Sequence, residues 1–342
     1  MSGDWAVEGL ALSQGGFHVG PVDLSLAPGE TVAVIGRSGS GKTTLLRALA
    51  GFVPLQDGTV RRDGADVGSA PPERRGAVYV PAGLGLFPDR TVRANLAFPG
   101  AVRGDPDPAA VGSAAERFGV AELLDRYPRT LSEGQRERVA VARATLARPS
   151  LLLWDEPLGA LDVESRRDLL EALGELRATE RFPVLLVTHD PTLGFSLADR
   201  FLVLDGGRVT FSGSAEDLVA APTDAFVGRF VGYANVFERS LLESASTTSA
   251  LARTLLARAG PAGVGAPPFP LSPDGVGPYT ARAERTLPSP EGNRIVGNVD
   301  GLPVTLAAPT GQATAKAGGT VQFDVDPTRL HPLGASRVPE HP

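Results

Sequence analysis

The sequence has no cysteine at all, and only one methionine and two tryptophans among its 342 residues. Without cysteine the chain can form neither disulfides nor thiolate metal sites, and this suits a reducing compartment. Redox chemistry based on thiols is therefore excluded.

The sequence also lacks a long apolar run. A membrane-spanning helix needs about 20 mostly apolar residues, whereas the apolar stretches here, such as Leu151 to Trp154, have the length of strands. The opening MSGDWAVEGL does not show the basic start and apolar run of a secretory signal. We therefore expect a cytoplasmic chain, with any membrane role peripheral and on the inner face of the cell membrane.

Positive charge is in the minority. Lys and Arg together number 33 against 39 Asp and Glu, which gives a net charge of -6, and no basic patch stands out. This balance provides no general attraction to nucleic acid, so nucleic acid is not expected as a partner. The content of 42% hydrophobic and 21% charged residues is ordinary for soluble globular proteins. Because one domain has roughly 150 residues, this length predicts two.

The sequence pattern of the first part of the chain predicts an α/β domain. Short apolar runs at 31–35, 151–154 and 184–187 alternate with longer helical stretches, as in a parallel sheet covered by helices. Segments 5–12 and 17–26 alternate like antiparallel strands and, with 58–64, predict a small β-layer beside that sheet.

The composition changes after Asn235. Gly and Pro become frequent, and short alternating runs occur at 294–299, 302–306 and 320–325. We predict an α/β domain over 1–232 and a separate small β-domain over 233–342.

A glycine-rich motif directly follows the first apolar run. Residues 36–43 read GRSGSGKT, which matches G-x-x-x-x-G-K-[ST] between the strand TVAVI and the helical TTLLRALAG. In such a loop, consecutive backbone N–H groups point at a phosphate, and the helix that follows adds its positive end. Lys42 would neutralise the β- and γ-phosphates, and the Thr43 hydroxyl would ligate Mg²⁺. A simple glycine-rich turn before a helix is the alternative, but the agreement of strand, loop and helix favours nucleotide binding. The predicted nucleotide-binding residues of this loop are Gly36, Arg37, Ser38, Gly39, Ser40, Gly41, Lys42, Thr43 and Thr44.

A P-loop alone leaves kinases, GTPases, helicases and transport ATPases open. Residues 131–144, LSEGQRERVAVARA, resemble the ABC signature, which usually reads LSGGQ. They are followed by LLLWDEP at 151–157, LGALD at 158–162 and VTHD at 187–190. This ordered set resembles the ATP-binding subunits of ABC transporters. The resemblance implies a RecA-like core, an antiparallel β-subdomain and a helical subdomain over about 83–149, with ATP and Mg²⁺ as ligands.

An acidic pair ends the apolar strand at 151–154. P-loop chemistry needs one carboxylate toward Mg²⁺ and another toward the attacking water. We therefore predict that Asp155 holds the hydrated metal and that Glu156 is the general base, although Asp-Glu-Pro by itself is a common strand end. The resemblance implies that His189 meets the γ-phosphate, whereas a lone histidine in a loop is usually only a surface group.

The signature gives the chain a second anion-binding element. Ser132 is expected to cap its helix, and the N–H groups around Gly134 and Gln135 form a helix end separate from the P-loop. The resemblance implies that this end faces the γ-phosphate of a second copy, so that two ATP molecules are sandwiched in a head-to-tail dimer, with Asp162 near the link. Phe17 resembles the family's adenine-stacking aromatic, and a core aromatic on a strand is an equal alternative.

Two positions depart from the family pattern. Ala82, in Tyr79-Val-Pro-Ala82, stands where the family usually has a Gln that touches Mg²⁺ and senses the membrane subunit. Glu133 replaces a signature glycine, and its carboxylate could repel a phosphate unless it points away. We expect the first change to slow turnover without abolishing nucleotide binding, and the second to be tolerated.

The C-terminal part resembles importer ATPases that carry an OB-like (TOBE) domain. The segment TDAFVGRFVGYANVF at 223–237 resembles the junction to that domain, and residues 319–333 resemble its closing strand. The resemblance implies transmembrane permease subunits as partners and, indirectly, a solute-binding protein. Related importers include sulfate and polyamine types, and the junction most resembles the molybdate/tungstate and ferric-iron types.

Two other functions stay open at this point. One is a nucleotide-gated ABC regulatory protein with weak hydrolysis, suggested by Ala82. The other is a non-transport ABC ATPase, which usually has tandem cassettes, coiled-coil insertions or basic surfaces that this sequence does not show.

Overall fold

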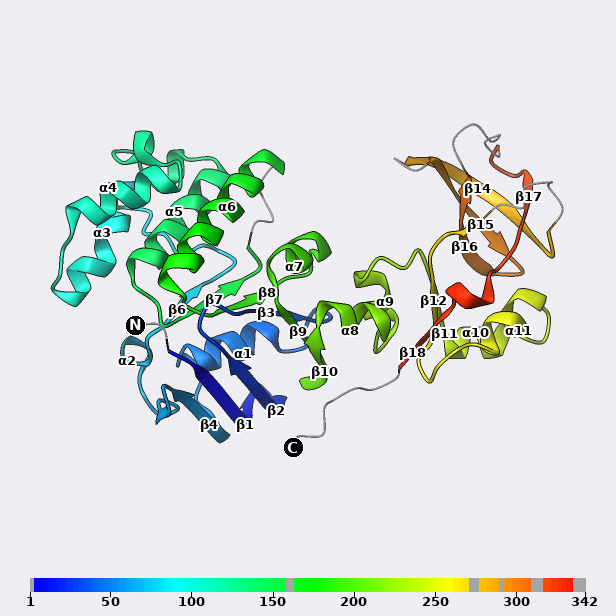
Figure 1. Cartoon of the computed structure of the whole chain (residues 1–342), viewed down its shortest axis with the longest axis horizontal. Coiled ribbons are helices and arrows are strands. Elements are labelled where there is room, and N and C mark those ends of the chain that lie inside the picture. Colours follow the sequence, from blue (N-terminus) through cyan, green and yellow to red (C-terminus); the bar gives the residue numbers. More distant parts are fainter. Residues whose placement is uncertain (1–2, 158–162, 271–276, 290–291, 309–315, 335–342) are drawn as a thin grey trace. The chain divides into compact units, whose positions relative to one another are not determined.

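The computed structural model describes residues 3–157, 163–270, 277–289, 292–308 and 316–334. The chain divides into two compact units, 1–212 and 213–342 (Figure 1). The domain boundary expected near residue 232 stays a prediction. Among the described residues, no helix combines the length and apolar character needed to cross a bilayer.

A six-stranded sheet forms the centre of the first unit. Its order is β10-β9-β3-β8-β7-β6, and β3 pairs in parallel with β8 and β9, as β7 does with β8 and β6. Every residue of β3, β7 and β8 is buried, because both faces of the sheet are covered. The strand bounds are β3 (Thr31–Ile35), β6 (Ala77–Val80), β7 (Leu151–Asp155), β8 (Val184–Val187), β9 (Arg200–Asp205) and β10 (Arg208–Ser214).

The two faces of the sheet have different cores. Along β7, Leu151 and Leu153 pack with α1 (Lys42–Leu49), whereas Leu152 and Trp154 pack with the helices of the other face. This alternation follows from the two-residue period of a strand. The helix that follows the P-loop and the helix that carries the signature therefore belong to opposite layers.

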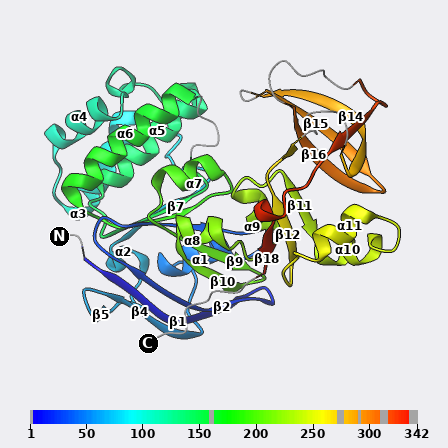
Figure 2. The same ribbon diagram turned by 45° about the vertical axis from the view of Figure 1, so that its right-hand side comes forward.

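A four-stranded antiparallel sheet shares the core of α1. Its order is β2-β1-β4-β5, and Figure 2 shows β5 beside β4 at its edge. The predicted small β-layer is thus confirmed. Its strands are β1 (Trp5–Gln14), β2 (Phe17–Leu26), β4 (Asp57–Arg62) and β5 (Ala65–Asp66).

Helices cover the other face of the sheet. The helix α5 packs against α3 and α4, and its capping box fixes where it begins. A short α2 (Pro72–Arg75) precedes β6. The remaining helices and turns of this unit are α3 (Val92–Arg103), α4 (Pro108–Arg117), η1 (Ala121–Leu123), η2 (Pro128–Thr130), α5 (Glu133–Leu146), α6 (Val163–Glu180) and α7 (Pro191–Leu197).

The second unit is rich in strands. It contains a three-stranded sheet, β11-β12-β18, and a five-stranded sheet, β13-β16-β15-β14-β17, as expected for an OB-like domain. Buried Asn235 connects β11 to the five-stranded sheet, since its amide donates to the carbonyl of Thr305 at 2.9 Å and accepts the Thr305 N–H at 2.7 Å. The strands are β11 (Asn235–Glu238), β12 (Gly263–Ala266), β13 (Phe269–Pro270), β14 (Tyr279–Ser289), β15 (Gly292–Val299), β16 (Leu302–Ala308), β17 (Thr320–Phe323) and β18 (His331–Leu333).

Helices also occur where the sequence analysis expected only strands and loops. Leu251 and Leu255 lie four residues apart and are buried with Leu242, which is the spacing of a helical face. The helices and turn of this unit are α8 (Ala215–Ala220), α9 (Ala225–Phe230), α10 (Arg239–Ala245), α11 (Ala250–Leu256) and η3 (Pro327–Arg329).

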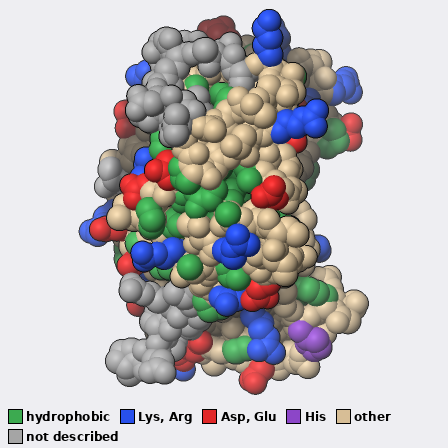
Figure 3. Space-filling view, turned by 90° about the vertical axis from the view of Figure 1, so that its right-hand side faces the viewer, with side chains coloured by type: hydrophobic (Ala, Val, Ile, Leu, Met, Phe, Trp, Pro, Cys, Tyr) green, Lys and Arg blue, Asp and Glu red, His purple; other side chains and the backbone are tan. Residues whose placement is uncertain are grey.

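One face of the molecule is seen in the space-filling view of Figure 3. Hydrophobic side chains gather near its middle, and Lys or Arg side chains alternate around them with Asp or Glu. Charges of both signs are therefore interspersed on this face.

Candidate active site

The P-loop is packed too closely for side chains at two of its glycines. A Cβ on Gly36 would meet the carbonyl oxygen of Leu204 and the hydroxyl of Ser40. Gly41 has φ of 100°, and a Cβ there would lie 3.1 Å from Cε1 of Phe17. The loop thus turns tightly from β3 into α1, whose first N–H groups are directed at the loop.

Lys42 spans this loop from the first residue of α1. Its buried side chain donates from Nζ to the carbonyls of Gly36 at 2.8 Å and Arg37 at 2.9 Å. Burial lowers the pKa of Lys42, and the nearby carboxylates of Glu156 and Asp155 oppose that shift. The Lys42 ammonium is therefore bonded to the loop and lies near two acids.

Asp155 faces α1 from the end of β7. The Thr43 hydroxyl donates to its Oδ1 at 3.1 Å, and the Tyr79 hydroxyl donates to its Oδ2 at 2.9 Å. Burial, with the hydrogen bond to Asp155, raises the pKa of Tyr79, so the phenol stays a neutral donor. Sequence reasoning assigned no role to Tyr79, although its place on an apolar strand before Ala82 was a usable signal.

Glu156 follows in a left-handed backbone conformation. Its φ is 49°, and its N–H donates to the carbonyl of Val187 at 2.9 Å, which fixes it against the end of β8. Strained residues of this kind persist only when their surroundings hold them, and they cluster at functional sites. Its Oε1 lies 3.6 Å from Nδ1 of His189, and both side chains are accessible, at 43% and 72% exposure.

The strand order brings these residues together. Because β8 lies between β3 and β7, the carboxyl ends of all three strands meet at one edge of the sheet. The P-loop follows the end of β3, His189 follows the end of β8, and the acidic pair lies at the end of β7. The structure therefore groups the predicted residues Lys42, Thr43, Asp155, Glu156 and His189 at one site.

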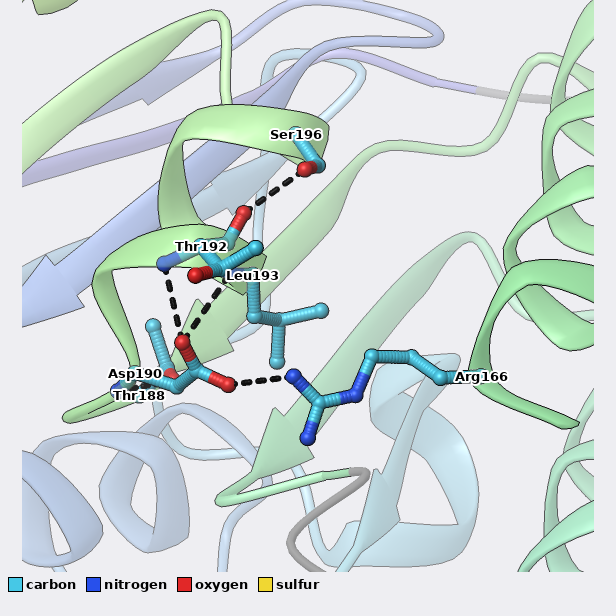
Figure 4. Close-up of polar contacts among 6 residues, drawn as sticks. All are labelled: Arg166, Thr188, Asp190, Thr192, Leu193 and Ser196. Carbon is cyan, nitrogen blue, oxygen red and sulfur yellow. Dashed lines mark hydrogen bonds and ion pairs between the residues drawn. The ribbon is translucent and has the colours of Figure 1, made fainter. Parts of the chain in front are cut away.

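The residue after His189 is held firmly, as Figure 4 shows. The Asp190 carboxylate accepts the N–H groups of Thr192 at 2.8 Å and Leu193 at 3.4 Å, which caps α7, and it pairs with Arg166 of α6 at 2.6 Å. Burial opposes ionisation, but the Leu193 N–H and Arg166 hold the pKa of Asp190 below its usual value. Sequence reasoning missed Arg166, whose partner is distant along the chain.

The signature residues begin α5. The Ser132 hydroxyl accepts the Gln135 N–H at 3.2 Å, and the Gln135 amide accepts the Ser132 N–H at 3.0 Å, so the predicted cap is present. Glu133 and Ser132 are exposed, and Gly134 is half-buried. An acid in the first turn stabilises a helix, which accounts for Glu133 at this position.

The comparisons with known proteins agree on the family. The ABC transporter family matches residues 19–159. The chain is 37% identical to a ferric-ion import ATP-binding protein of Streptomyces coelicolor, over 98% of each chain. It is 38% identical to a molybdate/tungstate import ATP-binding protein of Thermococcus kodakarensis, over 68% of this chain and 71% of that one. The chain belongs to the ATP-binding subunits of ABC importers. The predicted family and the ATPase activity coupled to import are thereby confirmed.

Solved structures support the predicted fold class of this ABC subunit. An ATP-binding subunit of an ABC transporter aligns with a TM-score of 0.58 and 25% identity, over 63% of this chain and 91% of that one. A dimeric ATP-binding cassette, bound to ADP and Pi after hydrolysis, aligns with a TM-score of 0.56 and 24% identity, over 61% of this chain and 98% of that one. The second likeness bears on the fold alone.

Two other residues singled out in the sequence analysis do not contact Lys42, Asp155 or Glu156 in any hydrogen bond or ion pair described above. Phe17 starts β2, is 37% exposed and has its ring beside Gly41. Ala82 is exposed just after β6. Asp162 lies outside the described residues.

Proposed function

We propose that this ABC subunit hydrolyses ATP with Mg²⁺ at the edge formed by β3, β7 and β8. The observation that supports this proposal is the hydrogen bond from the Thr43 hydroxyl to Oδ1 of Asp155 at 3.1 Å. Asp155 directly precedes Glu156 and lies beside the P-loop. In P-loop enzymes a hydroxyl and an acid at this place hold the metal, and a further group orients the attacking water.

The oxygen donors of the site fit Mg²⁺. This ion binds through one or two carboxylates, hydroxyl or water oxygens and the substrate phosphates. Among residues that the structure describes, no group of three or more His, Asp or Glu could hold a metal. Thr43 and Asp155, whose side chains lie 3.1 Å apart, would hold Mg²⁺ jointly with the phosphates of ATP, and the ion would offset negative charge on the transferred group.

Side chains of this chain bind the nucleotide and transfer the proton. Lys42 meets the β- and γ-phosphates from within the loop. Glu156, with its exposed carboxylate, takes a proton from the attacking water, and His189 steadies the γ-phosphate from the adjacent strand end. Phe17 stacks on the adenine next to Gly41.

A second copy of the chain completes the site in this proposal. The start of α5 is a capped helix end with exposed residues, and α5 and α1 lie on opposite faces of the sheet. A helix end of this kind binds anions. Two copies in head-to-tail order would each close the other's P-loop, with Ser132, Gly134, Gln135 and Asp162 at the junction. Permease subunits would recruit this dimer to the inner face of the cell membrane.

Ferric iron is the proposed cargo, with molybdate or tungstate second. The full-length likeness to the Streptomyces coelicolor protein supports iron. The test is to isolate the chain with its membrane subunits and solute-binding protein, reconstitute them in vesicles, and measure ATP-dependent uptake of labelled ferric iron and molybdate. Saturable uptake of iron is expected. Uptake of molybdate alone would select the second cargo, and uptake of neither would reject both.

Replacing Ala82 by Gln should raise ATP turnover. A group that supports a metal or its water typically changes activity by about 10- to 100-fold, so a gain of roughly tenfold is expected. ATPase rates are measured with and without the membrane subunits. The same change at exposed Ala109 of α4 is the control. Equal rates for Ala82→Gln and the wild type would show that position 82 does not limit turnover.

A further inference from the structure

Both oxygens of the Asp155 carboxylate are held by hydroxyl donors from different elements. Thr43 at the start of α1 donates to Oδ1 at 3.1 Å, and Tyr79 on β6 donates to Oδ2 at 2.9 Å. The carboxylate is therefore fixed from two sides.

The position of Tyr79 follows from the register of the parallel strands. Tyr79 pairs with Leu153 of β7, and Asp155 lies two residues further along the same face. Tyr79 packs against the core that contains α1, and the Phe52 ring lies edge-on to it at 5.9 Å between centroids. This packing holds the phenol in place so that its hydroxyl reaches the carboxylate.

The two donors differ in the proposed nucleotide-bound site. The Thr43 hydroxyl would bind the cation and also donate to the carboxylate, whereas Tyr79 donates to the opposite carboxylate oxygen. Three residues after Tyr79, Ala82 carries only a methyl group, so position 82 supplies no polar side chain. The hydroxyl of Tyr79 is thus the polar group that the end of β6 brings to Asp155.

We infer that Tyr79 is a positioning residue that sets the orientation of Asp155 for the divalent cation. The inference rests on the proposed function, in which Thr43 and Asp155 hold Mg²⁺. Partners that hydrogen-bond a ligating carboxylate typically contribute about 10- to 100-fold to metal affinity. Tyr79→Phe keeps the ring and its packing and removes only the donor.

The test uses the full chain loaded with a non-hydrolysable ATP analogue and Mn²⁺ as a paramagnetic probe. We expect Tyr79→Phe to bind Mn²⁺ about tenfold more weakly and to bind the analogue as the wild type does in EDTA. Tyr127→Phe, which removes a hydroxyl from a half-exposed tyrosine ahead of the signature, is the matched control and should match the wild type. Incorporation of 4-aminophenylalanine at position 79 restores a donor on the same ring and should recover most of the Mn²⁺ affinity.

Three results would count against the inference. Wild-type Mn²⁺ affinity in Tyr79→Phe would show that the hydroxyl is not needed. Equal loss in the 4-aminophenylalanine protein would assign the effect to packing instead of hydrogen bonding. A wild-type protein that binds the analogue but no Mn²⁺ would remove the proposed metal site itself, which separates failure of the function from failure of the role of Tyr79.

Discussion

Replacing Glu156 by Gln is expected to lower ATP turnover by about 10²- to 10⁴-fold, the range that general base catalysis supplies. Glutamine keeps the size of the side chain beside His189, and the backbone bond from position 156 to Val187 is unaffected, so the site keeps its shape. ATP should still bind. The variant should therefore accumulate as an ATP-loaded dimer, measured by size-exclusion chromatography with light scattering in ATP and Mg²⁺.

A matched control comes from the signature. Glu133→Gln makes the same chemical change at an exposed residue of the first turn of α5. It should leave turnover within a few-fold of the wild type. If Glu156→Gln turned over ATP at the wild-type rate and formed no more dimer, Glu156 would not be the base.

Loss of Lys42 is expected to weaken ATP binding by about 10- to 100-fold. Hydrogen bonds to charged groups each contribute about 1.5–3 kcal/mol, and the ammonium also holds the loop closed through Gly36 and Arg37. Isothermal titration of ATP into Lys42→Ala measures this loss. The melting temperature shows whether the fold is retained.

Charge alone should not rescue this position. Lys42 and Lys316 are the only lysines in a sequence that otherwise uses arginine for its positive charge. An ammonium is a compact point charge, whereas a guanidinium is a planar fork. The Lys42 Nζ lies 2.8 Å from the carbonyl oxygen of Gly36 and 2.9 Å from that of Arg37. We expect that a planar guanidinium does not fit between these two carbonyls. Lys42→Arg should therefore be nearly as impaired as Lys42→Ala, while Lys316→Ala, at an exposed residue, should bind ATP normally. Full affinity in Lys42→Arg would reduce the role of Lys42 to net charge.

Local patterns predicted much of the site. The P-loop follows a strand and opens a helix, and the acidic pair ends a buried strand, as the sequence indicated. The Ser132 cap was also predictable, since capping depends on residues three apart. The helices α10 and α11 were missed because each spans only seven residues, and so short a helix gives little periodic signal.

The sequence by itself determined the family, the nucleotide loop and the identity of the acids, because each is written in neighbouring residues whose spacing sets their local geometry. Only the tertiary structure decided which distant residues meet: Tyr79 with Asp155, His189 with Glu156, and Arg166 with Asp190. The first two contacts depend on the strand order β3-β8-β7-β6, and the third on the packing of α6 near the start of α7. Contacts of this kind join residues 24 to 76 positions apart, and no local pattern encodes them.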